Sequence, residues 1–207
     1  ESQSRMWENL IGRSRPFWDY CFPHARKAFP DALGSETTDT FYKAINTVFP
    51  SLIRVEADEV TYNLHIMLRF ELEQDMIAGK IRIQDLPEEW NDRMESWLGV
   101  RPSKDSDGVL QDIHWSLGAI GYFPTYALGN LMSTQLFNAA KKAIPDLDAK
   151  TSQGDFSALL DWLRTNVHQH GRRKTAGQIL LDATGSELSS ESWMHYAQSK
   201  FGELYGF

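Results

Sequence analysis

The sequence predicts an all-α fold, because helical periodicity dominates it and strand-like runs are few and short. One apolar stripe recurs at the spacing of a single helix face, and it consists of Phe156, Leu159, Leu160, Leu163 and Val167. Gly171 and a run of cations at 172–174 follow this stripe, as is typical of a helix C-terminus. A second stripe, Trp193, Ala197, Phe201 and Leu204, follows two serines at 189 and 190, and either can cap that helix.

The segment 58–78 predicts a long, central helix, with Asp58 as its candidate N-cap and Gly79 at its end. This segment is apolar over more than half of its circumference, so we expect most of it to be buried. The residues expected to be largely buried are Val60, Leu64, Met67 and Leu68.

Pro87 predicts the first turn of another helix, which ends near Gly99. Earlier helices are expected over 4–10, 16–29 and 38–48, and only 51–55 and 80–83 resemble strands. Repeats and low-complexity segments are absent. We therefore expect residues 1–207 to form a single helical domain with at most one or two short strands.

Composition excludes several classes of function. A formal net charge of −7 argues against a nucleic-acid binder and against an anionic membrane surface as partner, because no cationic surplus is available. Cys21 is the only cysteine, which excludes an intrachain disulfide and fits a reducing compartment. The longest uncharged stretch, 113–140, contains many polar residues and predicts buried protein instead of a membrane span. We expect a soluble, cytoplasmic protein.

Arg54 is the first candidate functional residue, because it lies inside the apolar run 51–55. A buried guanidinium is costly unless it finds an anion. It could pair with Asp58 or Glu56 and stiffen the start of the long helix. It could instead act as a fork for the carboxylate of a substrate, and both interpretations remain open.

Two further segments combine polar and aromatic side chains. The segment 108–115 places Gln111, Asp112, His114 and Trp115 within five positions, either as a buried network that anchors a loop or as a site. The segment 121–130 is rich in aromatic residues, which belong to a core more often than to a catalytic site.

The histidines do not predict a metal site within this chain. They stand at 24, 65, 114, 168, 170 and 195, and no two are four apart, as a helical zinc pair requires. His65 lies in the long apolar helix and predicts a hydrogen-bonded core histidine. The sequence also lacks a Gly-rich phosphate loop and a Gly-x-Ser-x-Gly nucleophile elbow.

Taken together, these segments resemble the carboxypeptidase Taq family of zinc metallocarboxypeptidases. Members of that family carry, in order, a His-Glu-x-x-His helix and the motifs His-Glu-Ser-Gln, Ile/Val-Arg-x-x-Ala-Asp and Gly-x-x-Gln-Asp-x-His-Trp. This chain opens with Glu-Ser-Gln at 1–3, continues with Ile-Arg-Val-Glu-Ala-Asp at 53–58, and matches the last motif at 108–115 without a mismatch. The resemblance covers the whole chain, roughly the last two-fifths of a family member, and implies the C-terminal part of a neurolysin-like zincin fold.

The resemblance implies that Glu1 is the third zinc ligand of the intact enzyme. Both ligand histidines and the glutamate that activates water would lie upstream. One carboxylate is a poor zinc site, so we expect this fragment alone to lack zinc and to be inactive.

The resemblance also implies roles for the other candidates. Arg54 would bind the free carboxylate of the substrate. In the related neurolysin-type peptidases a His and a Tyr about twelve residues apart serve the oxyanion region, and His114 and Tyr126 have that separation. Tyr122 is the second choice for the tyrosine. Gln111 and Asp112 would orient His114 or contact the substrate backbone.

The expected function is therefore the removal of single residues from peptides with a free C-terminus, by an enzyme that is a homodimer. The alternative is a non-catalytic α-helical interaction module, which leaves Arg54 and the segment 111–115 unexplained. A different hydrolase using Asp112 and His114 lacks an evident nucleophile. In the peptidase interpretation, Glu1, Arg54, His114 and Tyr126 should converge on one wall.

Overall fold

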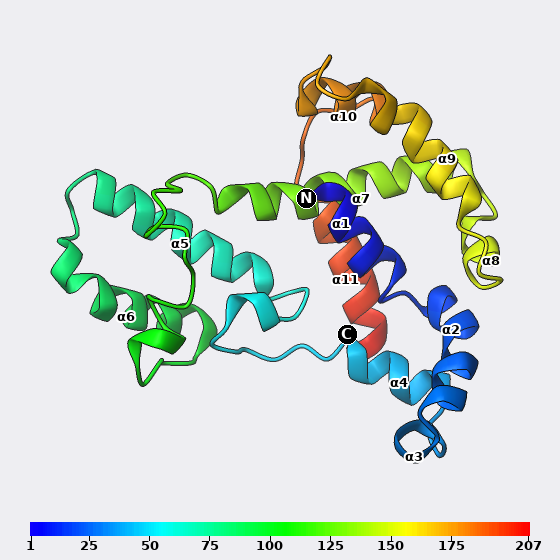
Figure 1. The fold of residues 1–207 in the computed structure, drawn as a ribbon, viewed down its shortest axis with the longest axis horizontal. Coiled ribbons are helices and arrows are strands. Elements are labelled where there is room, and N and C mark those ends of the chain that lie inside the picture. The colour runs from blue at the N-terminus through cyan, green and yellow to red at the C-terminus, as the bar shows by residue number, and fades with distance from the viewer. The chain divides into compact units, whose positions relative to one another are not determined.

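A computed structural model describes all residues from 1 to 207, and it contains helices and loops but no strand (Figure 1). The all-α prediction is confirmed. Contacts within the chain divide it into two compact units, residues 1–46 with 128–207 and residues 47–127. We call these unit 1 and unit 2. Whether the two units form one domain depends on how they are joined, so the single domain stays a prediction.

Unit 1 consists of helices from both ends of the sequence and the greater part of α7. Its helices are α1 (Ser2–Arg5), α2 (Arg15–Ala28), α3 (Pro30–Leu33), α4 (Thr38–Ile45), α7 (Pro124–Ala143), α8 (Leu147–Thr151), α9 (Ser157–Asn166), α10 (Ala176–Thr184) and α11 (Glu191–Tyr205). A π-helical turn, Met6–Ile11, continues α1. The first four residues of α7 belong to unit 2.

The core of unit 1 contains the stripe predicted near 160. Leu159 and Leu163 are fully buried beside Leu136, Leu147 and Leu180. The helix that carries this stripe ends earlier than predicted, at residue 166, and a 3₁₀ turn at 168–170 leads to the glycine at 171. Helix α11 matches its predicted stripe and follows Ser190 as its N-cap.

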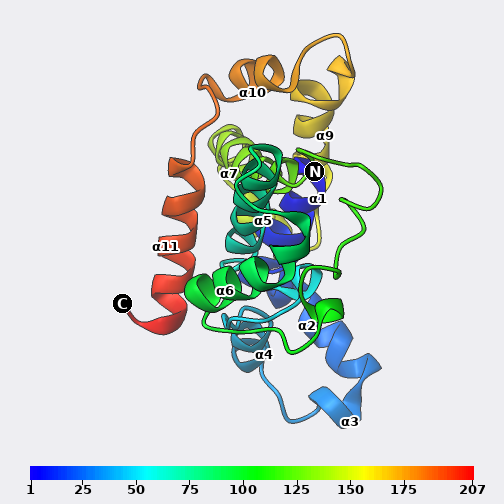
Figure 2. The ribbon, with the colours of Figure 1, turned by 90° about the vertical axis from the view of Figure 1, so that its left-hand side faces the viewer.

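Unit 2 is built on α5 (Tyr62–Ile77) and α6 (Leu86–Leu98), which lie side by side (Figure 1 and Figure 2). Their shared core consists of Leu68, Leu72, Leu86, Trp90, Met94 and Leu98. Helix α6 begins and ends as predicted, with Gly99 in the left-handed conformation at φ +70°. A smaller cluster of Tyr62, Ile66 and Phe123 connects α5 to the loop before α7.

The burial predicted for 58–78 is partly wrong. Leu68 is buried and Val60 and Leu64 are half-buried, but 48% of Met67 is exposed. Phe70 and Ile77, which follow it at helical spacing, are exposed as well. The apolar excess of α5 therefore includes an exposed stripe. The helix begins at residue 62, later than predicted, although Asp58 accepts hydrogen bonds from the backbone N–H groups of residues 60 and 61 as an N-cap side chain does.

Both strand predictions are wrong. Residues 54–56 and 83–85 form 3₁₀ turns. A strand needs a neighbour for its backbone hydrogen bonds, and no strand is present to provide one. The N–H groups of Glu56 and Ala57 instead bond locally to Ile53 O and Arg54 O, at 3.2 and 3.1 Å. No helix in the structure has the length and apolar character needed to cross a membrane.

Candidate functional site

Arg54, Asp112 and Arg69 form a buried ion cluster in unit 2. Arg54 Nη2 lies 2.6 Å from Asp112 Oδ1, and Arg69 Nε lies 2.8 Å from Asp112 Oδ2. The side chains of Arg54, Asp112 and Arg69 are 7%, 10% and 0% exposed. Two cations share one anion, so the three directly bonded groups carry a net charge of +1 inside the protein.

The bonds of Arg54 show which groups hold its guanidinium. Its Nε also donates to Asp112, and its Nη1 donates to the Tyr62 hydroxyl at 2.9 Å. The predicted pair with Asp58 or Glu56 is wrong, because the anionic partner is Asp112. A guanidinium has five N–H groups, and these bonds leave one on each terminal nitrogen of Arg54. The guanidinium also lies over the Tyr126 ring, 4.9 Å from its centroid.

The cluster keeps its charges at neutral pH. Burial opposes the charge of Arg54, but the hydrogen bonds and charge of Asp112 outweigh it and raise the pKa of Arg54. Burial lowers the pKa of Arg69 to about 10, against the pull of Asp112. Burial opposes ionisation of Asp112 as well, yet the two arginines lower the pKa of its carboxyl.

Gln111 connects the ion cluster to the backbone of two segments that lie before Arg54 and before Gln111 itself. Its Oε1 accepts from the Arg54 backbone N–H at 2.9 Å and from Arg69 Nη2 at 2.7 Å. Its Nε2 donates to the carbonyl oxygens of Leu52 and Asp107, at 3.0 and 2.9 Å. Gln111 therefore fixes the positions of Arg54 and Arg69 relative to the backbone at Leu52 and Asp107.

His114 and Tyr126 lie together beside the cluster. Nε2 of His114 lies 3.0 Å from the Tyr126 hydroxyl, and Nδ1 lies 3.7 Å from Asp112 Oδ1 without a hydrogen bond. The imidazole also packs on Phe123, with ring centroids 4.3 Å apart, and contacts Tyr122 at 5.5 Å. Burial lowers the pKa of His114, so the ring is neutral at pH 7.

Sequence reasoning missed two buried ionisable residues of α5, Arg69 and Glu73, and misjudged a third, His65. Arg69 belongs to the cluster, and the Glu73 carboxylate accepts from Trp115 Nε1 at 2.7 Å. His65, expected to be hydrogen-bonded, is fully buried and neither ring nitrogen has a partner, so that prediction is wrong. Burial, with the nearby charges of Arg69 and Arg54, lowers the pKa of His65 to about 4. The missed signal was three ionisable residues at four-residue spacing in a helix expected to be core.

Glu1 belongs to unit 1, where its side chain packs on α7. A Cβ added to Gly129 would lie 2.7 Å from Cβ and Cγ of Glu1, so the glycine makes room for this side chain. Glu1 Oε1 lies 3.5 Å from Arg5 Nε. No three His, Cys, Asp or Glu side chains of the chain are grouped so that they could hold a metal ion. The residues present therefore do not fit a complete metal site.

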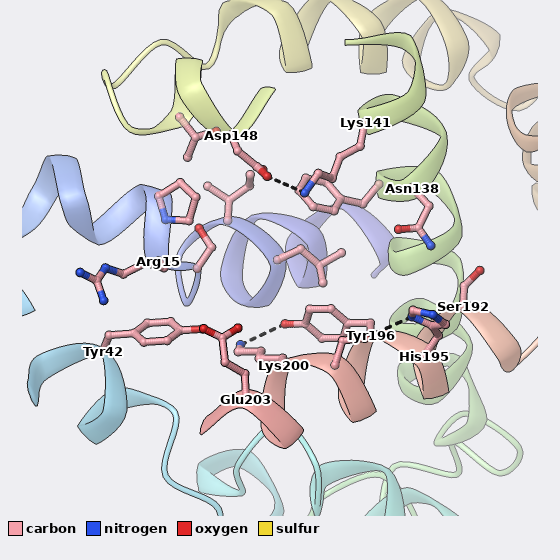
Figure 3. A pocket seen from close by; sticks show the side chains of 17 residues that line it. Arg15, Tyr42, Asn138, Lys141, Asp148, Ser192, His195, Tyr196, Lys200 and Glu203 are labelled. Atoms are coloured by element: carbon pink, nitrogen blue, oxygen red, sulfur yellow. Dashed lines mark hydrogen bonds and ion pairs between the residues drawn. The ribbon is translucent and has the colours of Figure 1, made fainter. Parts of the chain in front are cut away.

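A cavity of about 340 Å³ in unit 1 holds none of the predicted site residues (Figure 3). It lies among α2, α7, α8 and α11, and several of its polar groups bond to one another. Lys141 pairs with Asp148 at 2.7 Å, and Lys200 donates to the Tyr196 hydroxyl at 3.0 Å. Apart from Glu1, the residues singled out from the sequence lie in unit 2.

Comparison with known proteins agrees with the motifs. The sequence model of the carboxypeptidase Taq (M32) metallopeptidase family matches residues 1–201. The chain is 46% identical to thermostable carboxypeptidase 1 of Thermus thermophilus and 42% identical to carboxypeptidase 1 of Bacillus subtilis, covering 100% and 99% of this chain. It covers 40% and 41% of those two proteins, so it spans about two-fifths of their length.

The fold agrees as well. The crystal structure of an M32 carboxypeptidase from Deinococcus radiodurans R1 matches all of this chain with a TM-score of 0.97 and 49% identity, and 42% of that chain is covered. A Trypanosoma cruzi metallocarboxypeptidase matches 97% of this chain with a TM-score of 0.91 and 35% identity, over 42% of its own length. The resemblance read from the motifs is confirmed, and the chain belongs to the carboxypeptidase Taq (M32) metallopeptidase family.

Proposed function

We propose that this chain is the C-terminal part of a zinc-dependent carboxypeptidase that removes single residues from peptides with a free C-terminus. The supporting observation is the buried cation surplus of Arg54, Arg69 and Asp112, next to the His114–Tyr126 pair. A carboxypeptidase must distinguish a free terminal carboxylate from the internal amides of a peptide. A buried net positive charge with unused N–H groups provides that distinction, because an uncharged amide gains far less from it.

Arg54 is the residue that we assign to the substrate carboxylate. Asp112 holds the guanidinium by Nε and Nη2, and Tyr62 takes one N–H of Nη1, so the orientation is fixed before a substrate binds. Such pre-organisation lowers the entropy cost of binding. Gln111 and Asp112 act as positioning residues for the two arginines.

His114 and Tyr126 are assigned to the reacting carbonyl. A neutral imidazole and a phenol carry one donor hydrogen each, and the 3.0 Å bond between His114 Nε2 and the Tyr126 hydroxyl uses one of the two. The pair therefore offers one donor to a developing oxyanion, which such a donor stabilises in a site with little water. A neutral His114 has one N–H and one bare ring nitrogen, so its Nε2 can either donate to the Tyr126 hydroxyl or accept from it. Tyr122, whose ring lies 5.5 Å from both His114 and Tyr126, is the second choice for the phenol.

Zinc belongs, in this proposal, to the intact enzyme. A metal of this kind polarises a carbonyl and activates water. This chain contributes Glu1 as one carboxylate ligand, and we expect the histidine ligands in the part of such an enzyme that precedes it. We also expect the intact enzyme to be a cytoplasmic homodimer.

The test compares Arg54→Ala with Arg82→Ala in the full-length enzyme. Arg82 belongs to the same unit, and 71% of its side chain is exposed. Loss of a charge-assisted pair in a dry site is worth roughly 2–4 kcal/mol, which lowers kcat/KM about 30- to 1,000-fold. Asp112 keeps Arg69 as its partner in Arg54→Ala, so the site retains an ion pair.

The substrate should be a peptide with a free C-terminus, and a melting curve should check that each variant is folded. The expected result is a large loss for Arg54→Ala, a smaller loss for Arg54→Lys and no loss for Arg82→Ala. Equal activity of the two alanine variants would remove Arg54 from the site.

A further inference from the structure

One carboxylate holds both ends of the loop that carries the aromatic part of the site. Glu73 of α5 is 3% exposed. Its Oε1 accepts from Trp115 Nε1 at 2.7 Å, and both of its oxygens lie 3.2 Å from the Gly121 backbone nitrogen. Trp115 directly follows His114, and Gly121 directly precedes Tyr122. No ion pair joins Glu73 to either arginine of the cluster.

The loop between these two residues, 115–121, makes its other hydrogen bonds locally, to the backbone of residues 113–115. Leu117 is 72% exposed and Ile120 is 48% exposed, so the loop is not held by burial of its own apolar side chains. Gly118 and Gly121 have φ of +74° and +75°, and glycine is the residue that takes this conformation without strain. Its backbone turn is closed locally, by N–H groups of Leu117 and Ala119 that donate to His114 O at 3.2 and 2.9 Å. The contacts that tie it to other elements of the unit are those of Glu73 and the edge contacts of the Trp115 ring with Trp90 and Phe123 at 5.9 Å.

We propose that Glu73 is a positioning residue for the reaction, which pins both ends of the loop 115–121 and so keeps His114 and Tyr122 in place against Tyr126. This inference rests on the roles proposed above for His114 and Tyr126. It assigns Glu73 no contact with the substrate. A misplaced donor loses transition-state stabilisation, and a shift of about 1 Å can cost on the order of 100-fold in rate.

Glu73 also contributes charge. Asp112 and Glu73 favour the protonated state of His114, whereas burial and the two arginines oppose it. Tyr122 and Tyr126 complete the ionisable groups that face the imidazole. Removal of the negative charge of Glu73 should therefore lower the pKa of His114 further, and the lower limb of a pH–rate profile should move to lower pH.

The first experiment compares Glu73→Gln with Glu71→Gln in the full-length enzyme. Both residues lie on α5, and 51% of the Glu71 side chain is exposed, so it is a matched control for the chemical change. The amide introduced by Glu73→Gln keeps one carbonyl acceptor but turns an N–H₂ group toward a backbone N–H. We expect kcat to fall about tenfold or more with little change in KM, because Gln111 and Asp112 still hold Arg54. Glu71→Gln should match the parent.

A double-mutant cycle separates positioning from general damage. Trp115→Phe removes the indole N–H donor and keeps an aromatic ring, so it removes the same hydrogen bond by changing the donor instead of the acceptor. If the hydrogen bond between Trp115 and Glu73 is what positions the loop, the kcat losses of Glu73→Gln and Trp115→Phe should not add in the double variant. Additive losses would overturn the proposal. So would unchanged kcat in Glu73→Gln, or losses in kcat and KM that follow the melting temperature.

The two proposals fail in different ways. If Arg54→Ala is harmless while Glu73→Gln lowers kcat, the carboxylate assignment is wrong and Glu73 still positions the loop. If Arg54→Ala is severe and Glu73→Gln is harmless, the assignment of Arg54 survives and the role of Glu73 is wrong.

Discussion

His65 should make the folded chain sensitive to acid. Its ring is fully buried in α5 and neither nitrogen has a hydrogen-bond partner. Burial and the positive charges of Arg69 and Arg54 disfavour the imidazolium and lower the pKa of His65 to about 4. In the unfolded chain the imidazole is hydrated and titrates near pH 6.5.

The sign and size of the effect follow from this difference. Between about pH 4 and pH 6.5 the unfolded chain binds a proton at this position and the folded chain does not, so acid favours unfolding. The folded chain keeps its full stability at pH values above 6.5, the pKa of His65 in the unfolded chain, and loses stability as the pH falls toward 4. A shift from 6.5 to about 4, at about 1.4 kcal/mol per pH unit, amounts to about 3.5 kcal/mol in full, of which about 3 kcal/mol is lost by pH 4, where the ring in the folded chain is half protonated.

The measurement is urea unfolding of the chain at several pH values from 7 to 4. His65→Leu replaces the ring with an apolar side chain of similar size and cannot take up the proton. We expect His65→Leu to be at least as stable as the parent at pH 7, because two unpaired buried nitrogens are removed. The difference between the two proteins should then grow in favour of the variant by about 3 kcal/mol as the pH falls to 4.

His24→Leu, at an exposed position of α2, is the control and should keep the acid slope of the parent. Burial also lowers the pKa of His114, so a smaller slope of the same sign should remain in His65→Leu. Parallel profiles for the parent and His65→Leu between pH 6.5 and 4 would refute the reasoning.

Three further predictions concern other parts of the chain. Asp112→Asn should destabilise the fold by about 3–5 kcal/mol in urea, because two buried cations lose their shared anion, whereas the exposed Asp161→Asn should cost less than about 1 kcal/mol. Gly129→Ala should lower the melting temperature despite the better helix propensity of alanine, since its Cβ would lie 2.7 Å from the Glu1 side chain; Gly177→Ala, with open space, should not. The chain alone should bind no stoichiometric zinc and release no C-terminal residues, because Glu1 is its one family ligand. Elemental analysis and a carboxypeptidase assay with added zinc check this, and one tight metal per chain with activity would contradict it.

The helices could be predicted where apolar residues follow one face, as in α9 and α11, or where residues typical of helix ends mark both termini, as Pro87 and Gly99 do in α6. Helix α7 was not predicted, because most of its buried positions are small or polar, namely Gly129, Asn130, Ser133, Thr134, Gln135, Leu136 and Ala140. Such residues give no apolar period, although they allow close packing. Helix α10 was missed as well, although its capping box, Thr175 with Gln178, is a local signal visible in the sequence.

The residue types and motifs singled out the candidate residues, but the groups that bond to them could not be predicted. Asp112 lies 58 positions after Arg54, and only the fold brings the two together, so local reasoning chose Asp58 and Glu56. A resemblance of motifs likewise identifies residues without stating which groups hold them. This is why Gln111 and Asp112 were expected to orient His114 or to contact the substrate backbone, whereas their direct bonds in the structure are to the arginines.

Helix α5 nevertheless carried a readable signal for a polar site in the core. His65, Arg69 and Glu73 recur at four-residue spacing, so they share one face, and all three are buried. A buried ionisable group destabilises the fold unless it has a hydrogen-bond or ionic partner. Three such residues on one face of an apolar helix therefore need partners, or they lower the stability of the folded chain. Arg69 and Glu73 are satisfied by Asp112 and by the loop 115–121. His65 has no partner, and its penalty should appear as the acid sensitivity calculated above.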